Sequence, residues 1–113
     1  MTPHIQKLFD LMEEAWYPHQ EGTLELTVSA ESNHTIYIKS ERENGLTLIN
    51  SEEGEVSSTV KFDEDFLILI LQNLDTIDFR KPFIISQIES SGDFEFSSFL
   101  FHLIKRPASD VVW

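Results

Sequence analysis

The strongest constraint on this chain is a change in the spacing of its apolar residues after the first sixteen positions. From Ile5 to Trp16 apolar side chains recur every three or four residues, which is typical of one face of an α-helix. A proline at position 3 suits the first turn of such a helix, and Pro18 disfavours helical geometry in the residue before it. The sequence therefore predicts a helix that begins at Thr2-Pro3 and ends near Trp16.

The next forty residues alternate apolar and polar side chains with a period of two. Leu24, Leu26 and Val28, for example, are separated by polar residues, a pattern typical of a half-buried β-strand. Four such strands are predicted, at residues 23–30, 35–41, 46–50 and 56–62. The pair Asn44-Gly45 favours a hairpin because both residues tolerate positive φ. Short turns between the strands indicate an antiparallel meander.

The longest apolar run, Phe66–Leu71, follows three acidic residues. Asp63 is a good N-cap, and acids in the first turn of a helix interact favourably with its dipole. Six apolar residues also fit a strand, but the apolar stripe continues to Leu74, which favours a helix. The run is too short to cross the roughly 30 Å of a bilayer core.

The C-terminal part predicts two more strands, at residues 83–88 and 94–104, joined by a loop at 89–93. Ser97-Ser98 is the expected position of a bulge in the last strand. The predicted fold is α+β: an antiparallel meander sheet of about six strands with two helices on one face, in the order α-β-β-β-β-α-β-β. Residues 1–105 are expected to form one domain, and residues 106–113 a short C-terminal tail.

No residue pattern in the chain predicts catalysis, a cofactor or a metal. There is no cysteine, no nucleophile elbow of the GxSxG type, and no pair of histidines at metal-ligand spacing. The four glycines are isolated, whereas phosphate-binding loops are rich in glycine. We therefore expect a protein that is not an enzyme, holds no cofactor, and resides in the cytoplasm.

Charge is the most unusual property of the sequence. The chain has 20 acidic and 8 basic residues and a formal net charge of −12. This balance argues against binding of nucleic acids or of anionic membranes. Between Ser40 and Asp65 eight acids face only Arg42 and Lys61. These eight acids are Glu41, Glu43, Glu52, Glu53, Glu55, Asp63, Glu64 and Asp65.

Two interpretations of the acidic segment remain open: it keeps the domain soluble, or it forms a recognition surface for a basic protein. In an antiparallel meander, the acids at Glu41–Asn44 and those at Asp63–Asp65 would lie at the same end of the sheet. Tyr37, on the outward face of its strand, would supply an aromatic anchor beside them. Toxin domains, including nucleases with a positive active-site groove, are partners with the required charge.

The chain resembles bacterial immunity proteins of polymorphic-toxin and contact-dependent inhibition systems, the YezG-like group in particular. The similar features are the helix ending in Glu13–Trp16, the alternating strand after it, and the segment Gly92–Phe96. The resemblance implies an antitoxin that binds a basic toxin domain, as a monomer or homodimer, and masks its active site.

Two other functions compete with this one. The segment from Phe66 to Leu74 is similar to the central helix of type III secretion chaperones. A small-ligand-binding domain, with a pocket between sheet and helices, is the third hypothesis. For that pocket the sequence offers two polar candidates, Gln87 and His102.

Overall fold

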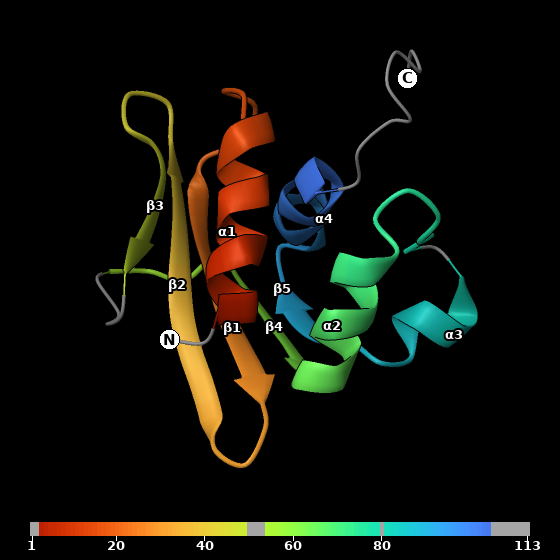
Figure 1. Ribbon diagram of the computed structural model, residues 1–113. Coiled ribbons are helices and arrows are strands. Elements are labelled where there is room, and N and C mark those ends of the chain that lie inside the picture. Colours follow the sequence, from red (N-terminus) through yellow and green to blue (C-terminus); the bar gives the residue numbers. More distant parts are fainter. Residues whose placement is uncertain (1–2, 50–53, 80, 105–113) are drawn as a thin grey trace.

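The computed structural model describes residues 3–49, 54–79 and 81–104, and they form an α+β fold (Figure 1). The first five elements are α1 (Pro3–Ala15), β1 (Gly22–Ser29), β2 (Asn33–Glu41), β3 (Gly45–Ile49) and β4 (Ser58–Asp63). They are followed by α2 (Glu64–Gln72), α3 (Pro82–Ile85), β5 (Glu89–Gly92) and α4 (Phe94–Ile104). The α+β class and the order of the first six elements are confirmed.

The five strands form one mixed sheet in the order β3-β2-β1-β4-β5. Strands β1, β2 and β3 pair antiparallel, as predicted, and Gly45 has φ +74° in the turn of the β2–β3 hairpin. Strand β4 then crosses to the far side of β1 and pairs with it in parallel, so the predicted all-antiparallel meander is wrong at this point. Strand β5 closes the sheet, antiparallel to β4.

Helices α1, α2 and α4 pack against strands of this sheet and cover one of its faces (Figure 1). Helix α1 places Ile5, Leu8 and Met12 in the core, which is the apolar stripe that its sequence predicts. The inward residues of β1, β2 and β4 meet these helices, while the alternate residues lie on the open face. The core is therefore a single layer of side chains between sheet and helices.

Helices α2 and α4 each begin at an aspartate that accepts a hydrogen bond from the backbone. Asp63 Oδ1 accepts from Phe66 N at 2.7 Å, and Asp93 Oδ1 accepts from Phe96 N at 3.1 Å. Such bonds satisfy N–H groups that have no partner within the first turn. The predicted N-cap role of Asp63 and the helical state of the run after it are confirmed.

The two strands predicted near the C-terminus are wrong. Residues 82–85 form the short helix α3, and residues 94–104 form α4. The last strand of the sheet lies instead at Glu89–Gly92, where a loop is predicted. Seven of the eleven α4 residues are buried, so its sequence is apolar on nearly every side and shows no clear period of either kind.

The serines at the predicted bulge lie inside α4. Ser97 Oγ donates to the Phe94 carbonyl at 3.1 Å, a bond that helical serines commonly make with the preceding turn. The predicted C-terminal tail, 106–113, lies outside the described residues, and the single domain at 1–105 stays a prediction.

Candidate functional site

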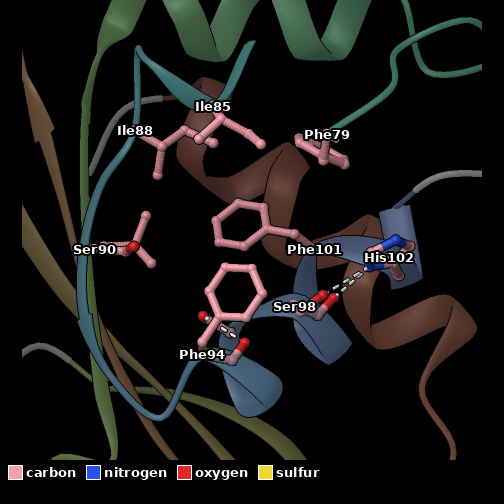
Figure 2. A pocket seen from close by; sticks show the side chains of 10 residues that line it. Phe79, Ile85, Ile88, Ser90, Phe94, Ser98, Phe101 and His102 are labelled. Atoms are coloured by element: carbon pink, nitrogen blue, oxygen red, sulfur yellow. Dashed lines mark hydrogen bonds between the residues drawn. The ribbon is translucent and has the colours of Figure 1, made fainter. Parts of the chain in front are cut away.

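A hollow lies between α4, the β4–β5 edge of the sheet, and the segment that leads through α3 into β5 (Figure 2). Its lining is predominantly aromatic and aliphatic. The lining residues are Val60, Phe79, Ile85, Ile88, Ser90, Phe94, Ser97, Ser98, Phe101 and His102.

One wall of the hollow is a single stripe of α4. The five α4 residues in the lining follow one another at intervals of three, one, three and one, which places them on one face of a helix. They are Phe94, Ser97, Ser98, Phe101 and His102.

The floor and the opposite wall come from other elements. Val60 of β4 and Ser90 of β5 are register partners, so both side chains point toward the same face of the sheet. Ile85, Ile88 and Phe79 lie across from α4, and the Phe101 ring lies between the two walls (Figure 2). The hollow thus depends on long-range packing of four elements.

Aromatic contacts fix the inner end of the hollow. The Phe101 ring centroid is 6.0 Å from that of Phe62 and 6.1 Å from that of Phe79. Phe79 also packs against the His102 ring, with 6.2 Å between centroids. Tilted and edge-to-face contacts of this kind hold the rings in place.

Three polar side chains of the lining, those of Ser97, Ser98 and His102, make hydrogen bonds within α4. His102 Nδ1 lies 2.7 Å from the Ser98 carbonyl oxygen, so in the neutral ring Nδ1 donates this bond and Nε2 is the acceptor. Ser97 is bonded within the same helix. Within the described part of the chain, Ser90 Oγ and His102 Nε2 make no hydrogen bond. The hollow is therefore predominantly apolar; among its polar residues Ser97 is buried, whereas Ser90 and His102 are exposed.

The hollow is small and open on one side. The volume of the hollow is about 90 Å³. At its mouth Ile85 and Phe94 are 51% and 71% exposed. Ligand pockets commonly measure roughly 300–1,000 Å³, so the hollow is smaller than a typical ligand pocket.

The structure divides the predicted acidic residues between opposite ends of the sheet. Glu41 pairs with Gly45 at the end where β1 begins, whereas Asp63 pairs with Ser29 at the end where β1 ends. The length of β1 separates the two ends by about 23 Å, at roughly 3.3 Å per residue. The prediction that these acids share one end is wrong, because β4 runs parallel to β1.

The other candidates are also spread out. Tyr37 lies half-buried in the middle of β2, and Glu55 is exposed ahead of β4. Glu43 is exposed in the β2–β3 turn. Glu52 and Glu53 lie outside the described residues.

Several of these acids have partners within the chain. Asp63 caps α2, Glu64 lies 3.8 Å from His4 Nδ1, and Glu41 accepts from Asn44 at 3.2 Å. Asp65 is exposed in the first turn of α2, where its charge suits the helix dipole. Local structure therefore explains the placement of these four acids.

Asp63 and Glu43 provide a test of that explanation. Replacing Asp63 with alanine removes the α2 cap and should lower the free energy of unfolding by about 1 kcal/mol. Glu43→Ala, at an exposed turn position, should change it by less than about 0.5 kcal/mol. Urea unfolding of both variants measures the difference, and equal values would contradict the capping role.

Other kinds of site were sought among residues 3–49, 54–79 and 81–104. No group of three metal-ligating side chains is close enough there to hold an ion. No helix in that part of the chain has the length and apolar character needed to span a membrane.

No family model matches the sequence, and no curated protein does. Solved structures do match. The sterol carrier protein 2 like 2 of Aedes aegypti, determined in palmitated form, superposes with a TM-score of 0.70 at 15% identity, over 92% of this chain and 93% of that one. The sterol carrier protein domain 2 of Helicoverpa armigera gives a TM-score of 0.65 at 13% identity, over 96% and 97% of the two chains.

These matches overturn the identity expected from the sequence. The fold is that of sterol carrier proteins, so the resemblance to immunity proteins is wrong, and so is the resemblance to type III secretion chaperones. The predicted function as an antitoxin, with a basic toxin domain as its partner, falls with that identity. Charge and element order, on which both resemblances relied, are shared by many unrelated small domains.

The same fold also occurs inside longer enzymes. A double mutant of the sec-alkyl sulfatase PisA1 from Pseudomonas matches with a TM-score of 0.70 at 20% identity, over 94% of this chain, which spans only 17% of the sulfatase. Identities of 13 to 20% establish the fold alone. The chain therefore shares the fold of sterol carrier protein 2 domains.

Proposed function

We propose that this protein binds a small hydrophobic ligand with an acyl chain in the hollow beside α4. The observation that carries the proposal is the predominantly apolar lining, which four elements build and which includes the exposed polar residues Ser90 and His102. An apolar cleft with a few polar groups at fixed positions is the usual form of a small-molecule site. The sterol carrier fold, including a relative determined in palmitated form, supports the same class of ligand.

The lining gives the ligand an orientation. The acyl chain of the ligand lies along the Phe94 and Phe101 rings, because burial of each methylene group stabilises binding by about 0.8 kcal/mol. The polar end stays at the rim, within reach of Ser90 Oγ or His102 Nε2. Because the space is narrow, a long chain displaces Ile85 and Ile88 outward as it enters.

We also propose that the protein acts as a carrier without catalysis. Ser98 and His102 stand one helical turn apart, but the imidazole Nδ1 is bonded to the Ser98 carbonyl oxygen, where a catalytic pair would have an orienting carboxylate. Among the described residues the one His–carboxylate contact is that of His4 with Glu64, which are not part of the hollow.

Filling the hollow tests the proposal. Ser90→Trp places an indole against Val60 on the inner face of the sheet, and we expect it to weaken binding of a fluorescent fatty acid at least about tenfold, or 1.4 kcal/mol. Fluorescence titration with displacement by palmitate measures the affinity.

The matched control is Ser91→Trp on the same strand. Ser91 pairs with Thr59 and its side chain points to the opposite face of the sheet, where its Oγ lies 2.5 Å from that of Thr59. We expect this variant to bind the probe within about twofold of wild type, well below the 1.4 kcal/mol of a tenfold change. Absence of binding by the wild type, or equal loss in both variants, would overturn the proposal.

A further inference from the structure

Two neighbours hold the imidazole ring of His102 in place on the wall of the hollow. Nδ1 lies 2.7 Å from the carbonyl oxygen of Ser98, one helical turn earlier, and the Phe79 ring packs against the imidazole with 6.2 Å between centroids. Ser98 and Phe79 are themselves part of the lining. With one nitrogen bonded and one side of the ring packed, Nε2 is the polar atom that His102 offers to a ligand.

The hydrogen bond to Ser98 fixes which nitrogen of the ring carries the proton. A carbonyl oxygen can only accept, so in the neutral ring the proton lies on Nδ1 and the lone pair on Nε2. The Ser98 hydroxyl also lies 3.3 Å from Nδ1. If that hydroxyl donated to Nδ1, the Nδ1 lone pair would face the carbonyl oxygen at the shorter distance of 2.7 Å, which is repulsive. Neutral His102 therefore presents an acceptor, and no donor, at Nε2.

The rest of the lining supplies no charge for the polar end of a ligand. Among the lining residues that the structure describes, none is a lysine, arginine, aspartate or glutamate. Ser90 Oγ is the other side-chain polar atom there without a hydrogen bond, and it comes from β5, on the opposite side of the hollow (Figure 2). A carboxylate has only acceptors, so it finds no hydrogen at Nε2, whereas a hydroxyl group has a hydrogen to donate.

We propose that His102 selects the polar end of the ligand, with Nε2 accepting a hydrogen bond from a hydroxyl group. The favoured ligand is then an uncharged lipid whose chain carries a terminal hydroxyl, such as a fatty alcohol or a monoacylglycerol, in preference to the same chain with no donor. This inference rests on the proposed function, because it requires the chain to occupy the hollow. It adds the class of polar group, which the apolar lining alone does not determine.

A pair of ligands that differ in one hydrogen-bond donor tests the selection. Dodecanol and dodecyl methyl ether have the same chain and the same oxygen, but only the alcohol can donate. At about pH 8, where imidazoles are ordinarily neutral, each competes with the fluorescent fatty acid for the wild-type protein. We expect dodecanol to bind about fivefold more tightly, the usual effect of one neutral hydrogen bond. Burial of the additional methyl group would by itself favour the ether.

Two variants assign the preference to one atom. His102→Phe keeps a ring against Phe79 and removes the acceptor, so it should bind the alcohol and the ether within about twofold of each other. His102 is exposed, so this substitution should leave the fold intact. Ser90→Ala is the matched control, because it removes the free hydroxyl on the opposite side of the hollow, and it should keep the roughly fivefold preference for the alcohol.

The possible results separate this inference from the proposed function. If the wild-type protein does not bind the fluorescent fatty acid, the proposed function is wrong and the selection by His102 is wrong with it. If the protein binds the probe but takes the alcohol and the ether equally well, selection by His102 is wrong and the proposed function stands. An unchanged preference in His102→Phe, or its loss in Ser90→Ala, would assign the hydroxyl to another partner and overturn the role of His102.

Discussion

Phe96→Ala is expected to destabilise the protein by about 3–5 kcal/mol, whereas Phe94→Ala should cost less than about 0.5 kcal/mol. The two phenylalanines stand two positions apart at the start of α4. Phe96 is 1% exposed and packs in the core, so its removal leaves a cavity, while Phe94 lies at the open mouth of the hollow. On a helix, residues two apart point in nearly opposite directions.

The pair distinguishes the helix from the strand that the sequence predicts. On a strand, residues two apart point to the same face, so both substitutions would then cost similar amounts. Urea unfolding monitored by circular dichroism gives both free energies under the same conditions. Similar losses in the two variants would contradict α4 in this register.

The first half of the fold was predictable because its elements are amphipathic. Residues of α1 and β1 alternate between core and solvent with the period of their own secondary structure, and Asp63 marks the start of α2. Residues 94–104 have no such contrast, since they are surrounded by other elements on most sides. An apolar segment buried all round fits a central strand as well as a core helix.

The parallel pairing of β4 had no local signal. Turn residues after β3 fit a hairpin that returns beside β3 as well as a connection that crosses to the far side of β1. Long-range register depends on which apolar faces pack together, and α2 and α4 help to decide it by covering β4. The error in strand pairing then misplaced the acids, because Asp63 ends β4 and moves with it.

The candidate site was lost through the same misassignment of residues 94–104. If residues 94–104 formed a strand, Phe94, Ser98 and His102 would point to one face and Phe101 to the other. Read as a helix, all four fall on one stripe and form a wall. Of the two polar candidates that the sequence offers for a ligand pocket, His102 is an exposed residue of the lining, whereas Gln87 is not part of the lining.

The net charge of the chain gives no indication of the hollow. The sequence contains 20 acidic residues, but several of them cap a helix or form a hydrogen bond within a turn, so local structure explains their positions.

Replacing Gly92 with alanine adds a single methyl group but should lower the free energy of unfolding strongly. It has φ +85° at the end of β5, and a Cβ there would lie 2.6 Å from the Ser57 carbonyl oxygen and 2.9 Å from Ser58 Cα. Both contacts are with backbone, so no side chain can rotate away. The positive φ alone costs roughly 1–2 kcal/mol for a residue other than glycine.

We therefore expect Gly92→Ala to lower the free energy of unfolding by about 3 kcal/mol and the melting temperature by roughly 12 °C, at about 4 °C per kcal/mol. Gly45→Ala is the matched control. Its φ is also positive, +74°, but the nearest atoms to an added Cβ are 3.9 Å away on the Trp16 side chain, so only the backbone penalty of about 1 kcal/mol applies. Asp93 N, in the peptide after Gly92, donates a hydrogen bond to Ser57 O at 2.9 Å. A Cβ at position 92 must therefore also move Asp93, the N-cap of α4, away from the residues that precede β4. Gly92→Ala should therefore lose fatty-acid binding as well as stability, whereas Gly45→Ala should keep fatty-acid binding. Thermal denaturation measures the stability of both variants, and titration with the fluorescent fatty acid measures their binding.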